Sequence, residues 1–240
     1  MQDKHKKLLQ WFSLNFIISA VLLIVSVLIF TLIANEAVLE HEKIVDDKVF
    51  SFFDSIVTPG IINIMQVFTF FGSAQFLLPA YIVLAGYFFL RKKYINGFEI
   101  IIVGIASQAL LYGLKQLFHR QRPNLSLIKN ITTYSFPSGH TFSSLVFYSI
   151  IIYIIGRGKW KPVYKWITSI FLLLFALTIG LSRIILKVHY PTDVFASLCL
   201  AVAWVISCNW ILKRINKKSA NILLGRDEGA NIKTKDSTHN

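Results

Sequence analysis

The stretch WFSLNFIISAVLLIVSVLIFTLIA, residues 11–34, contains no charged side chain. About 20 consecutive apolar residues are enough for a helix to cross the hydrocarbon core of a bilayer. The stretch is preceded by KHKK, as a secretory signal would be, but the apolar core of a signal has only about 7 to 15 residues. The following IANEA is also a poor cleavage site. We therefore predict an uncleaved first transmembrane helix.

Five further apolar blocks follow along the chain. They span residues 71–90, 97–117, 141–155, 166–181 and 194–212. Counting residues 11–34 as the first block, the fourth, residues 141–155, is short, and its helix could begin earlier, at Pro137 or Ser138. Only 15% of the residues are charged, against about 25% in soluble domains, and the mean hydropathy is +0.58. The sequence predicts an all-α integral membrane protein, with residues 11–212 forming one six-transmembrane-helix bundle.

The loop after the first helix is too long to be bare and contains two amphipathic stretches. In DDKVFSFFDSIV, the apolar Val49, Phe52 and Ile56 oppose acidic residues, which is typical of a short interfacial helix. GIINIMQVFTFFG suits a second helix of this kind. We expect these helices to anchor and cover the outer mouth of the bundle. The alternative is that they shape an entrance for a lipid.

The net charge of +13 could indicate a nucleic-acid partner, but its distribution argues against one. Basic residues cluster at the N-terminus and after the second, fourth and sixth blocks, which all share one side. Six of the twelve acids lie in the loop after the first block, on the other side. The positive-inside rule then predicts cytoplasmic termini in the cell membrane. Residues 1–10 and 213–240 would be cytoplasmic tails, the second basic and disordered.

Three polar clusters remain once the basic loops are set aside. They are KQLFHRQRP at residues 115–123, FPSGHTF at residues 136–142 and SRIILKVHYPTDV at residues 182–194. The first two lie in the loop after the third block and the last follows the fifth block. The predicted topology therefore places all three clusters on the outer face, where they can converge.

The first cluster contains two cations, Lys115 and Arg122. Seven residues of helix make nearly two turns, so both cations would share one face if the helix persisted to Pro123. A proline disfavours helix at the residue before it, so the chain should turn at Arg122. Taken alone, the pair could equally be two cations that snorkel at a membrane edge.

The other two clusters are both typical of helix N-termini. Ser138, Gly139 and His140 open the fourth helix, where unpaired N–H groups favour an anion, although an ordinary helix start would look the same. Pro191 suits the first position of the sixth helix. Asp193 then lies in the first turn, where it could reach back to the His189 ring or merely cap the helix.

Together the clusters supply three cations (with Arg183), a helix N-terminus and two histidines, one of which has an acidic partner. This set matches phosphoryl transfer from a phosphate ester, which needs a cationic cradle, a nucleophile and a proton donor for the leaving oxygen. Without an active site, the snorkelling cations, the ordinary helix start and the capping aspartate would all have to occur by coincidence on the same side of the membrane. We therefore interpret the three clusters as one active site.

The three clusters resemble the signature motifs of the type 2 phosphatidic acid phosphatase superfamily, which includes lipid phosphate phosphatases and vanadium haloperoxidases. The spacing agrees at every signature position. The resemblance implies that His189 is the nucleophile, that Asp193 orients it and that His140 protonates the leaving group. It further implies a phosphate cradle formed by Lys115, Arg122, Arg183, Ser138 and Gly139. It implies no metal and no cofactor.

We expect a membrane lipid phosphate as substrate, which reaches from the lipid bilayer a site on its outer face. Undecaprenyl pyrophosphate is favoured, followed by phosphatidylglycerol phosphate and phosphatidic acid. A lipid phosphotransferase using the same phosphohistidine is the alternative, and a non-catalytic lipid-binding or transport protein is a further one. We expect no nucleic-acid partner, and the oligomeric state stays open. We interpret His119, Arg120 and Lys187, which have no place in the motifs, as interfacial residues.

Overall fold

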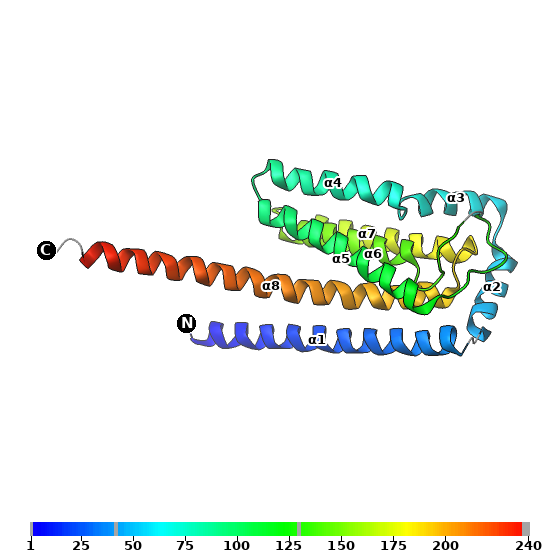
Figure 1. Cartoon of the computed structure of the whole chain (residues 1–240), viewed down its shortest axis with the longest axis horizontal. Helices are drawn as coiled ribbons and strands as arrows, with labels where there is room; N and C mark the ends of the chain where they lie inside the picture. Colours follow the sequence, from blue (N-terminus) through cyan, green and yellow to red (C-terminus); the bar gives the residue numbers. More distant parts are fainter. Residues whose placement is uncertain (1, 41–42, 129–130, 237–240) are drawn as a thin grey trace. The chain divides into compact units, whose positions relative to one another are not determined.

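The computed structural model describes residues 2–40, 43–128 and 131–236. These residues form helices joined by turns and one long connection, with no strand among them (Figure 1). The elements are α1 (Gln2–Ala34), the π-helix η1 (Asn35–Leu39), α2 (Ile44–Ile56), α3 (Pro59–Phe70), α4 (Ala74–Leu90), α5 (Tyr94–Phe118), α6 (Gly139–Arg157), α7 (Pro162–Ile185) and α8 (Pro191–Asp236).

Six helical segments in the described part of the chain are long and apolar enough to cross a membrane. They are Leu14–Leu39, Pro59–Leu90, Tyr94–Phe118, Gly139–Arg157, Pro162–Ile185 and Pro191–Arg214. Their outward surfaces are strongly apolar, with Val83 and Trp166 about 70% exposed. Such a continuous apolar surface is expected of helices that face lipid rather than water. The prediction of an all-α bundle with six spans is confirmed.

The second span is longer than the sequence analysis predicted, because it joins α3 to α4. Thr58 and Ser73 cap the two helices, accepting hydrogen bonds from the backbone N–H groups of Ile61 and Phe76. Between the helices, a Cβ at Gly72 would lie 2.5 Å from Ile179 and 2.7 Å from Ser144. The junction therefore lies so close to α6 and α7 that any side chain larger than that of glycine would clash at this position.

The chain divides into two compact units, Met1–Val205 and Ile206–Asn240, each with most of its contacts inside itself. The second unit contains the continuation of α8 to Asp236, although the sequence predicted a disordered tail over residues 213–240. No proline interrupts residues 213–236, and a helix that has already formed extends without a new nucleation step. The division of the chain at residues 10 and 212 stays a prediction.

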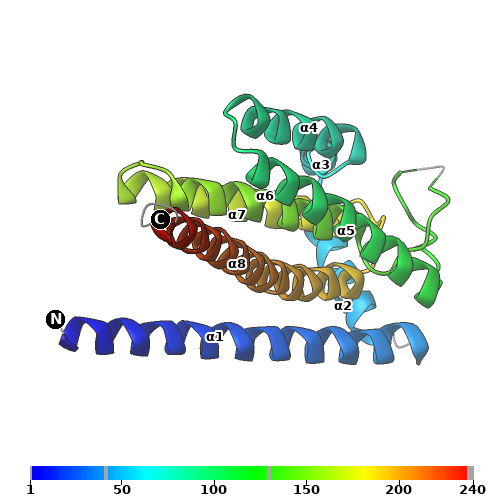
Figure 2. The ribbon, with the colours of Figure 1, turned by 60° about the vertical axis from the view of Figure 1, so that its left-hand side comes forward.

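In the first unit, α6 packs against α7 and also contacts α4 and α5, and the first half of α6 is buried. The connection between α5 and α6 leaves the end of α5 and returns over the same end of the bundle to start α6 (Figures 1 and 2). Phe136 in this connection is fully buried and packs with Ala34, Val38 and Ala196. This contact joins α1, the connection and α8 at the end of the bundle that carries the polar clusters.

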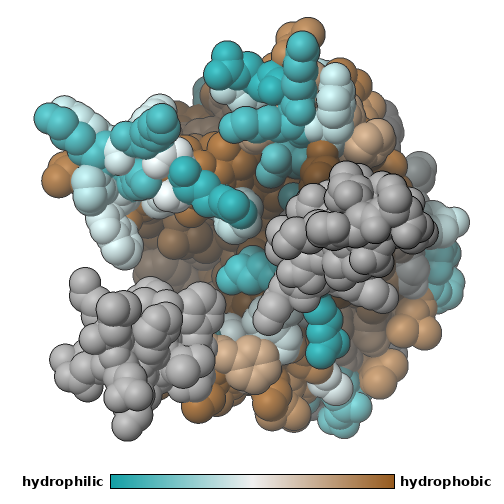
Figure 3. All heavy atoms as spheres, turned by 90° about the vertical axis from the view of Figure 1, so that its left-hand side faces the viewer, coloured by the Kyte–Doolittle hydropathy of each residue, from teal (hydrophilic) through white to brown (hydrophobic). Residues whose placement is uncertain are grey.

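The opposite end of the bundle carries the short turns α4–α5 and α6–α7. The first contains Arg91, Lys92 and Lys93, and the second contains Lys159 and Lys161 and follows Arg157, the last residue of α6. Figure 3 views the molecule from this end and shows hydrophilic side chains gathered around a largely apolar surface. The first unit thus separates its basic turns from its buried polar cluster by the length of the helices.

Candidate active site

Lys115 and Arg122 reach the site from different kinds of backbone. The helix α5 ends at Phe118, and His119 adopts a left-handed conformation with φ 48°, so the chain turns before it reaches Arg122. The shared helical face that a longer helix would have given is therefore not formed. Lys115 instead donates from Nζ to the carbonyl oxygen of Tyr134, at 2.5 Å, and lies 3.5 Å from that of Ser135.

Arg122 joins two segments of the site. Its Nε donates to the carbonyl oxygen of Thr133 at 2.7 Å, and one terminal nitrogen donates to the Thr133 hydroxyl at 3.0 Å. The other terminal nitrogen donates to the carbonyl oxygen of Val188 at 2.9 Å. Burial lowers the pKa of Arg122 from its ordinary value, but a guanidinium stays charged in proteins. Arg122 therefore places a positive charge beside His189, the residue after Val188.

His189 is buried with its two ring nitrogens in different surroundings. Nδ1 lies 3.4 Å from Asp193 Oδ2 and 3.3 Å from Ser135 Oγ, whereas Nε2 lies 3.3 Å from a terminal nitrogen of Arg122. A guanidinium can only donate, so this last contact requires a lone pair on Nε2 and places the ring proton on Nδ1. Burial, reinforced by Arg122 and two further cations, lowers the pKa of His189 well below its ordinary value. The ring is therefore neutral, and the lone pair of Nε2 faces Arg122.

Asp193 lies in the first turn of α8, which begins at Pro191 as predicted. It is fully buried, and its Oδ2 accepts hydrogen bonds from the Ser135 hydroxyl and, at 2.9 Å, from the backbone N–H of Tyr190. The same oxygen faces Nδ1 of His189. A carboxylate held in this way fixes the tautomer and the orientation of the imidazole.

Arg183 and His140 complete the set from α7 and α6. Arg183 is 3% exposed and donates to the Thr69 hydroxyl of α3, while its buried Nε has no hydrogen-bond partner among the described residues. An unpaired buried guanidinium N–H is costly, and an anion would satisfy it. His140 lies in the first turn of α6, near enough to Arg183 and His189 for electrostatic interaction.

Ser138 and Gly139 form the start of α6, as the sequence predicted. Ser138 is the residue before the first helical position, and its hydroxyl hydrogen-bonds that of Thr141 at 2.9 Å. Its backbone N–H points to the carbonyl oxygen of Asp193 at 3.4 Å. A Cβ at Gly139 would lie 3.3 Å from Leu111 and 3.9 Å from Cε of Lys115. The helix start is thus in direct contact with the segments that carry Lys115 and Asp193.

The structure brings all eight predicted site residues together at one end of the bundle. Lys115 is an electrostatic neighbour of Arg122, Arg183 and Asp193, and His140 interacts with the same cations. Within the described ranges, no group of three or more His, Cys, Asp or Glu side chains could hold a metal ion. The cluster combines a concentrated positive charge with a neutral histidine, an arrangement that suits a phosphate group.

Arg120 is not an interfacial residue, and the prediction from the sequence is wrong on this point. Its side chain is only 9% exposed, and it forms ion pairs with Asp193 at 2.6 Å and with Asp46 at 2.8 Å. The physical reason is the turn at His119, after which the backbone carbonyl of Arg120 accepts a hydrogen bond from Ser135 N–H. Spacing within the motif could not reveal this, because Asp46 is 74 positions away. Lys187 pairs with the exposed Asp54 at 2.7 Å, and His119 is exposed.

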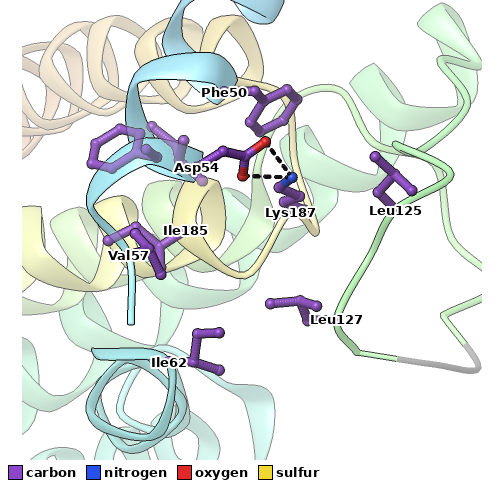
Figure 4. Close-up of a pocket in the computed structure, with 10 residues that line it drawn as sticks. Phe50, Asp54, Val57, Ile62, Leu125, Leu127, Ile185 and Lys187 are labelled. Atoms are coloured by element: carbon purple, nitrogen blue, oxygen red, sulfur yellow. Dashed lines mark hydrogen bonds and ion pairs between the residues drawn. The ribbon is translucent and has the colours of Figure 1, made fainter. Parts of the chain in front are cut away.

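An apolar pocket of about 300 Å³ lies beside the polar cluster. Figure 4 shows its walls, which come from α2, the start of α3, the α5–α6 connection and the end of α7. The lining residues are Phe50, Phe53, Asp54, Val57, Ile62, Leu125, Leu127, Ile184, Ile185 and Lys187. The Asp54–Lys187 ion pair provides its only charged side chains, so the pocket offers mainly apolar contact.

Comparison with known proteins points in the same direction as this geometry. The family model described as PAP2 superfamily matches residues 97–217. Phosphatidylglycerophosphatase B of Bacillus subtilis (strain 168) is 30% identical over 146 residues, which are 60% of this chain and 71% of that protein.

Two solved structures resemble the fold. The first is described as the first transmembrane PAP2 type phosphatidylglycerolphosphate phosphatase from Bacillus subtilis. It has a TM-score of 0.70 and 26% identity, covering 82% of this chain and 96% of that one. The second is LpxE of Aquifex aeolicus, with a TM-score of 0.50 and 26% identity over 68% of this chain and 93% of that one.

Proposed function

We propose that this chain, which belongs to the PAP2 superfamily and is a membrane lipid phosphatase, hydrolyses phosphatidylglycerol phosphate. The reaction would pass through a phosphohistidine at His189. The observation that carries the mechanism is the neutral His189, whose Nε2 faces Arg122 inside a cluster of cations. The sequence alone favoured undecaprenyl pyrophosphate. The curated relative and the first solved structure, both from Bacillus subtilis, are named for phosphatidylglycerol phosphate, and this moves that lipid to first place.

The first step transfers the phosphoryl group to the enzyme. The lone pair of His189 Nε2 attacks phosphorus, and the bond from phosphorus to the lipid oxygen breaks. The electron pair of that bond goes to the leaving oxygen, which takes a proton from protonated His140. Lys115, Arg122 and Arg183 would hold the phosphate oxygens, with the free Nε of Arg183 supplying one donor. Preorganised donors of this kind stabilise the charge that develops in the transition state.

The second step releases phosphate. His140, now neutral, takes a proton from water as the water oxygen attacks phosphorus. The bond between phosphorus and Nε2 breaks, and its electron pair returns to His189. Asp193 Oδ2 faces Nδ1 and holds the ring proton there throughout, so that Nε2 remains the reacting atom. A hydroxyl acceptor in place of water would convert the same intermediate into a phosphotransferase product.

The lipid tail also has a plausible environment. The substrate is amphiphilic, and each methylene moved from hydrocarbon into water costs about 0.8 kcal/mol. The site lies at the ends of apolar spans, and the apolar pocket borders the segments that carry Arg183 and His189. Both features support a lipid whose chains stay in the bilayer while its phosphate enters the cationic cluster.

Phosphate release by the purified protein tests this function. The substrates are phosphatidylglycerol phosphate, undecaprenyl pyrophosphate and phosphatidic acid, in detergent with excess EDTA. We expect release to persist in EDTA, to be fastest with phosphatidylglycerol phosphate, and to be lost in His189→Asn. The matched control is His119→Asn, because His119 is an exposed histidine outside the cluster. His140→Ala should lower kcat about 100- to 10,000-fold, the range for general acid catalysis.

The outcomes separate the parts of the proposal. Activity that EDTA removes and zinc or magnesium restores would contradict the metal-free mechanism. Substantial turnover by His189→Asn would contradict the assignment of the nucleophile. Release only from undecaprenyl pyrophosphate would replace the substrate and leave the mechanism intact.

A further inference from the structure

A buried chain of charges connects α2 to the proposed catalytic residues. Arg120 lies between two aspartates, with one terminal nitrogen 2.8 Å from Asp46 Oδ2 and the other 2.6 Å from Asp193 Oδ1. Both carboxylates are fully buried and Arg120 is 9% exposed. The three residues come from α2, from the α5–α6 connection and from α8. Burying three charges is costly unless each is paired, so the arrangement is sensitive to the loss of any one member.

Thr192 closes this chain into a ring. Its backbone N–H donates to Asp46 Oδ1 at 2.9 Å, and its hydroxyl donates to Asp46 Oδ2 at 2.9 Å. Arg120 in turn donates to the Thr192 hydroxyl at 2.8 Å, and its guanidinium stacks 4.1 Å from the centre of the Tyr190 ring. Asp46 thus holds both Arg120 and the first turn of α8, which carries Asp193.

The two oxygens of Asp193 have separate partners as a result. Oδ1 is bound by Arg120, and Oδ2 is left to Ser135, to the N–H of Tyr190 and to Nδ1 of His189. With Arg120 in place, the carboxylate cannot rotate without losing an ion pair. Its orientation toward His189 therefore depends on Arg120, and the orientation of Arg120 depends on Asp46.

The face of α2 that carries Asp46 is the face that lies against the site. Asp46, Phe50 and Phe53 recur at intervals of three or four residues, so they share one side of the helix. Figure 4 shows Phe50 and Asp54 of α2 and Val57, which follows the helix, beside the end of α7, with Asp54 paired to Lys187. Asp46 is the one member of this side that reaches into the charged network.

We propose that Asp46 and Arg120 are positioning residues, which hold Asp193 and through it His189 in the orientation needed for attack. This inference rests on the proposed function. It gives α2 a part in the reaction as well as a covering role. No atom of Asp46 or Arg120 need touch the substrate, because their effect passes through Asp193.

Charge supplies a signature that a merely structural contact would lack. The groups facing His189 are Lys115 of α5, His140 of α6, Arg122 of the connection, Arg183 of α7 and Asp193 of α8. Arg120 faces Asp46 of α2 and Asp193 of α8. Without the Arg120 charge, the negative charge of Asp193 is less compensated, so the protonated form of His189 is favoured and its pKa should rise. Without the Asp46 charge, Arg120 compensates Asp193 more fully, so the pKa of His189 should fall.

The test compares Asp46→Asn and Arg120→Gln with wild type, using the lipid that the wild type hydrolyses fastest. We expect kcat to fall about 10- to 100-fold in each, the range known for groups that orient metal-binding residues, with KM within about twofold. The acidic limb of the kcat/KM profile should move to higher pH in Arg120→Gln and to lower pH in Asp46→Asn, by about half a pH unit or more. Asp47→Asn, on the exposed side of α2, is the control and should match wild type.

A second variant keeps the test decisive if the charge variants fold poorly. Thr192→Val removes the shared hydroxyl and keeps both charges, so it should lower kcat and leave the acidic limb in place. The inference is overturned if Asp46→Asn or Thr192→Val has wild-type kcat, or if the two charge variants shift the limb in the same direction. A wild-type protein that releases phosphate from no lipid would instead refute the proposed function.

Discussion

His189 is a buried neutral imidazole, and this has a consequence for the stability of the fold. Its pKa is well below the ordinary value of about 6.5 because of burial and nearby cations. Below about pH 6.5 the unfolded chain therefore binds a proton that the folded protein does not. The free energy of unfolding should fall as the pH decreases from 7 to 5, by up to about 1.4 kcal/mol per pH unit from this one group.

Thermal unfolding in detergent at pH 7 and pH 5 measures this effect. The decrease in Tm between the two pH values should be smaller in His189→Asn than in wild type, because the variant has no imidazole to protonate on unfolding. His119→Asn, at an exposed histidine, is expected to keep the wild-type decrease. Equal decreases in all three proteins would mean that His189 is not the group responsible.

At the residue scale, the sequence could indicate residues whose role is set by local spacing. Asp193 lies one helical turn after His189, and Ser138, Gly139 and His140 open a helix, so their placement follows from the motif itself. Arg120 is different, because its burial depends on Asp46, a residue in another helix. A long-range ion pair leaves no periodic signal, so the sequence analysis placed Arg120 at the interface.

At the scale of the element, α2 has two apolar sides with different surroundings. Phe50 and Phe53 are partly buried against the site, whereas Val45, Phe52 and Ile56 are about half exposed or more and lie on a neighbouring strip of the helix. Exposed apolar residues gathered on one strip of an amphipathic helix are typical of insertion into a membrane interface. We therefore expect this strip to lie in the bilayer surface while the Asp46 side contacts the site.

A fluorescent probe measures this orientation independently of enzyme activity. Single cysteines at Phe52 and Asp47, each labelled with an environment-sensitive fluorophore in a cysteine-free background, would be compared in lipid vesicles. The probe at position 52 should emit at shorter wavelength than the probe at position 47, because Asp47 lies on the exposed polar side. Identical emission at positions 52 and 47 would show that the Phe52 strip of α2 does not face the membrane.

The elements themselves were largely predictable, because hydrophobic length decides a transmembrane helix. The α1 and α5 blocks, and the helix starts at Ser138 and Pro191, follow from apolar runs and capping residues. The second span was the exception. Its first half, α3, has the composition of an interfacial helix, but it packs against α7 and its Thr69 binds Arg183. Tertiary contact, which a hydropathy pattern does not encode, makes α3 part of the bundle.

At the scale of the whole molecule, charge is distributed unequally between the two ends of the helices. The α4–α5 and α6–α7 turns are basic, whereas the acids of α2 lie at the end that carries the site. By the positive-inside rule, the basic turns should be cytoplasmic and the site should face outward. The phosphate of the substrate would then lie in the outer leaflet, and a lipid could approach the site from the side.

Two single-cysteine variants test this orientation in intact cells. Asn124→Cys lies in the α5–α6 connection near the site, and Lys159→Cys lies in the α6–α7 turn, and both positions are exposed. In a background without Cys199 and Cys208, a membrane-impermeant thiol reagent should label position 124 and not position 159, and both should be labelled after permeabilisation. The reverse pattern would place His189 and its cationic cradle in the cytoplasm. The substrate would then have to be a lipid of the inner leaflet, and an outward-facing carrier lipid such as undecaprenyl pyrophosphate could no longer be considered.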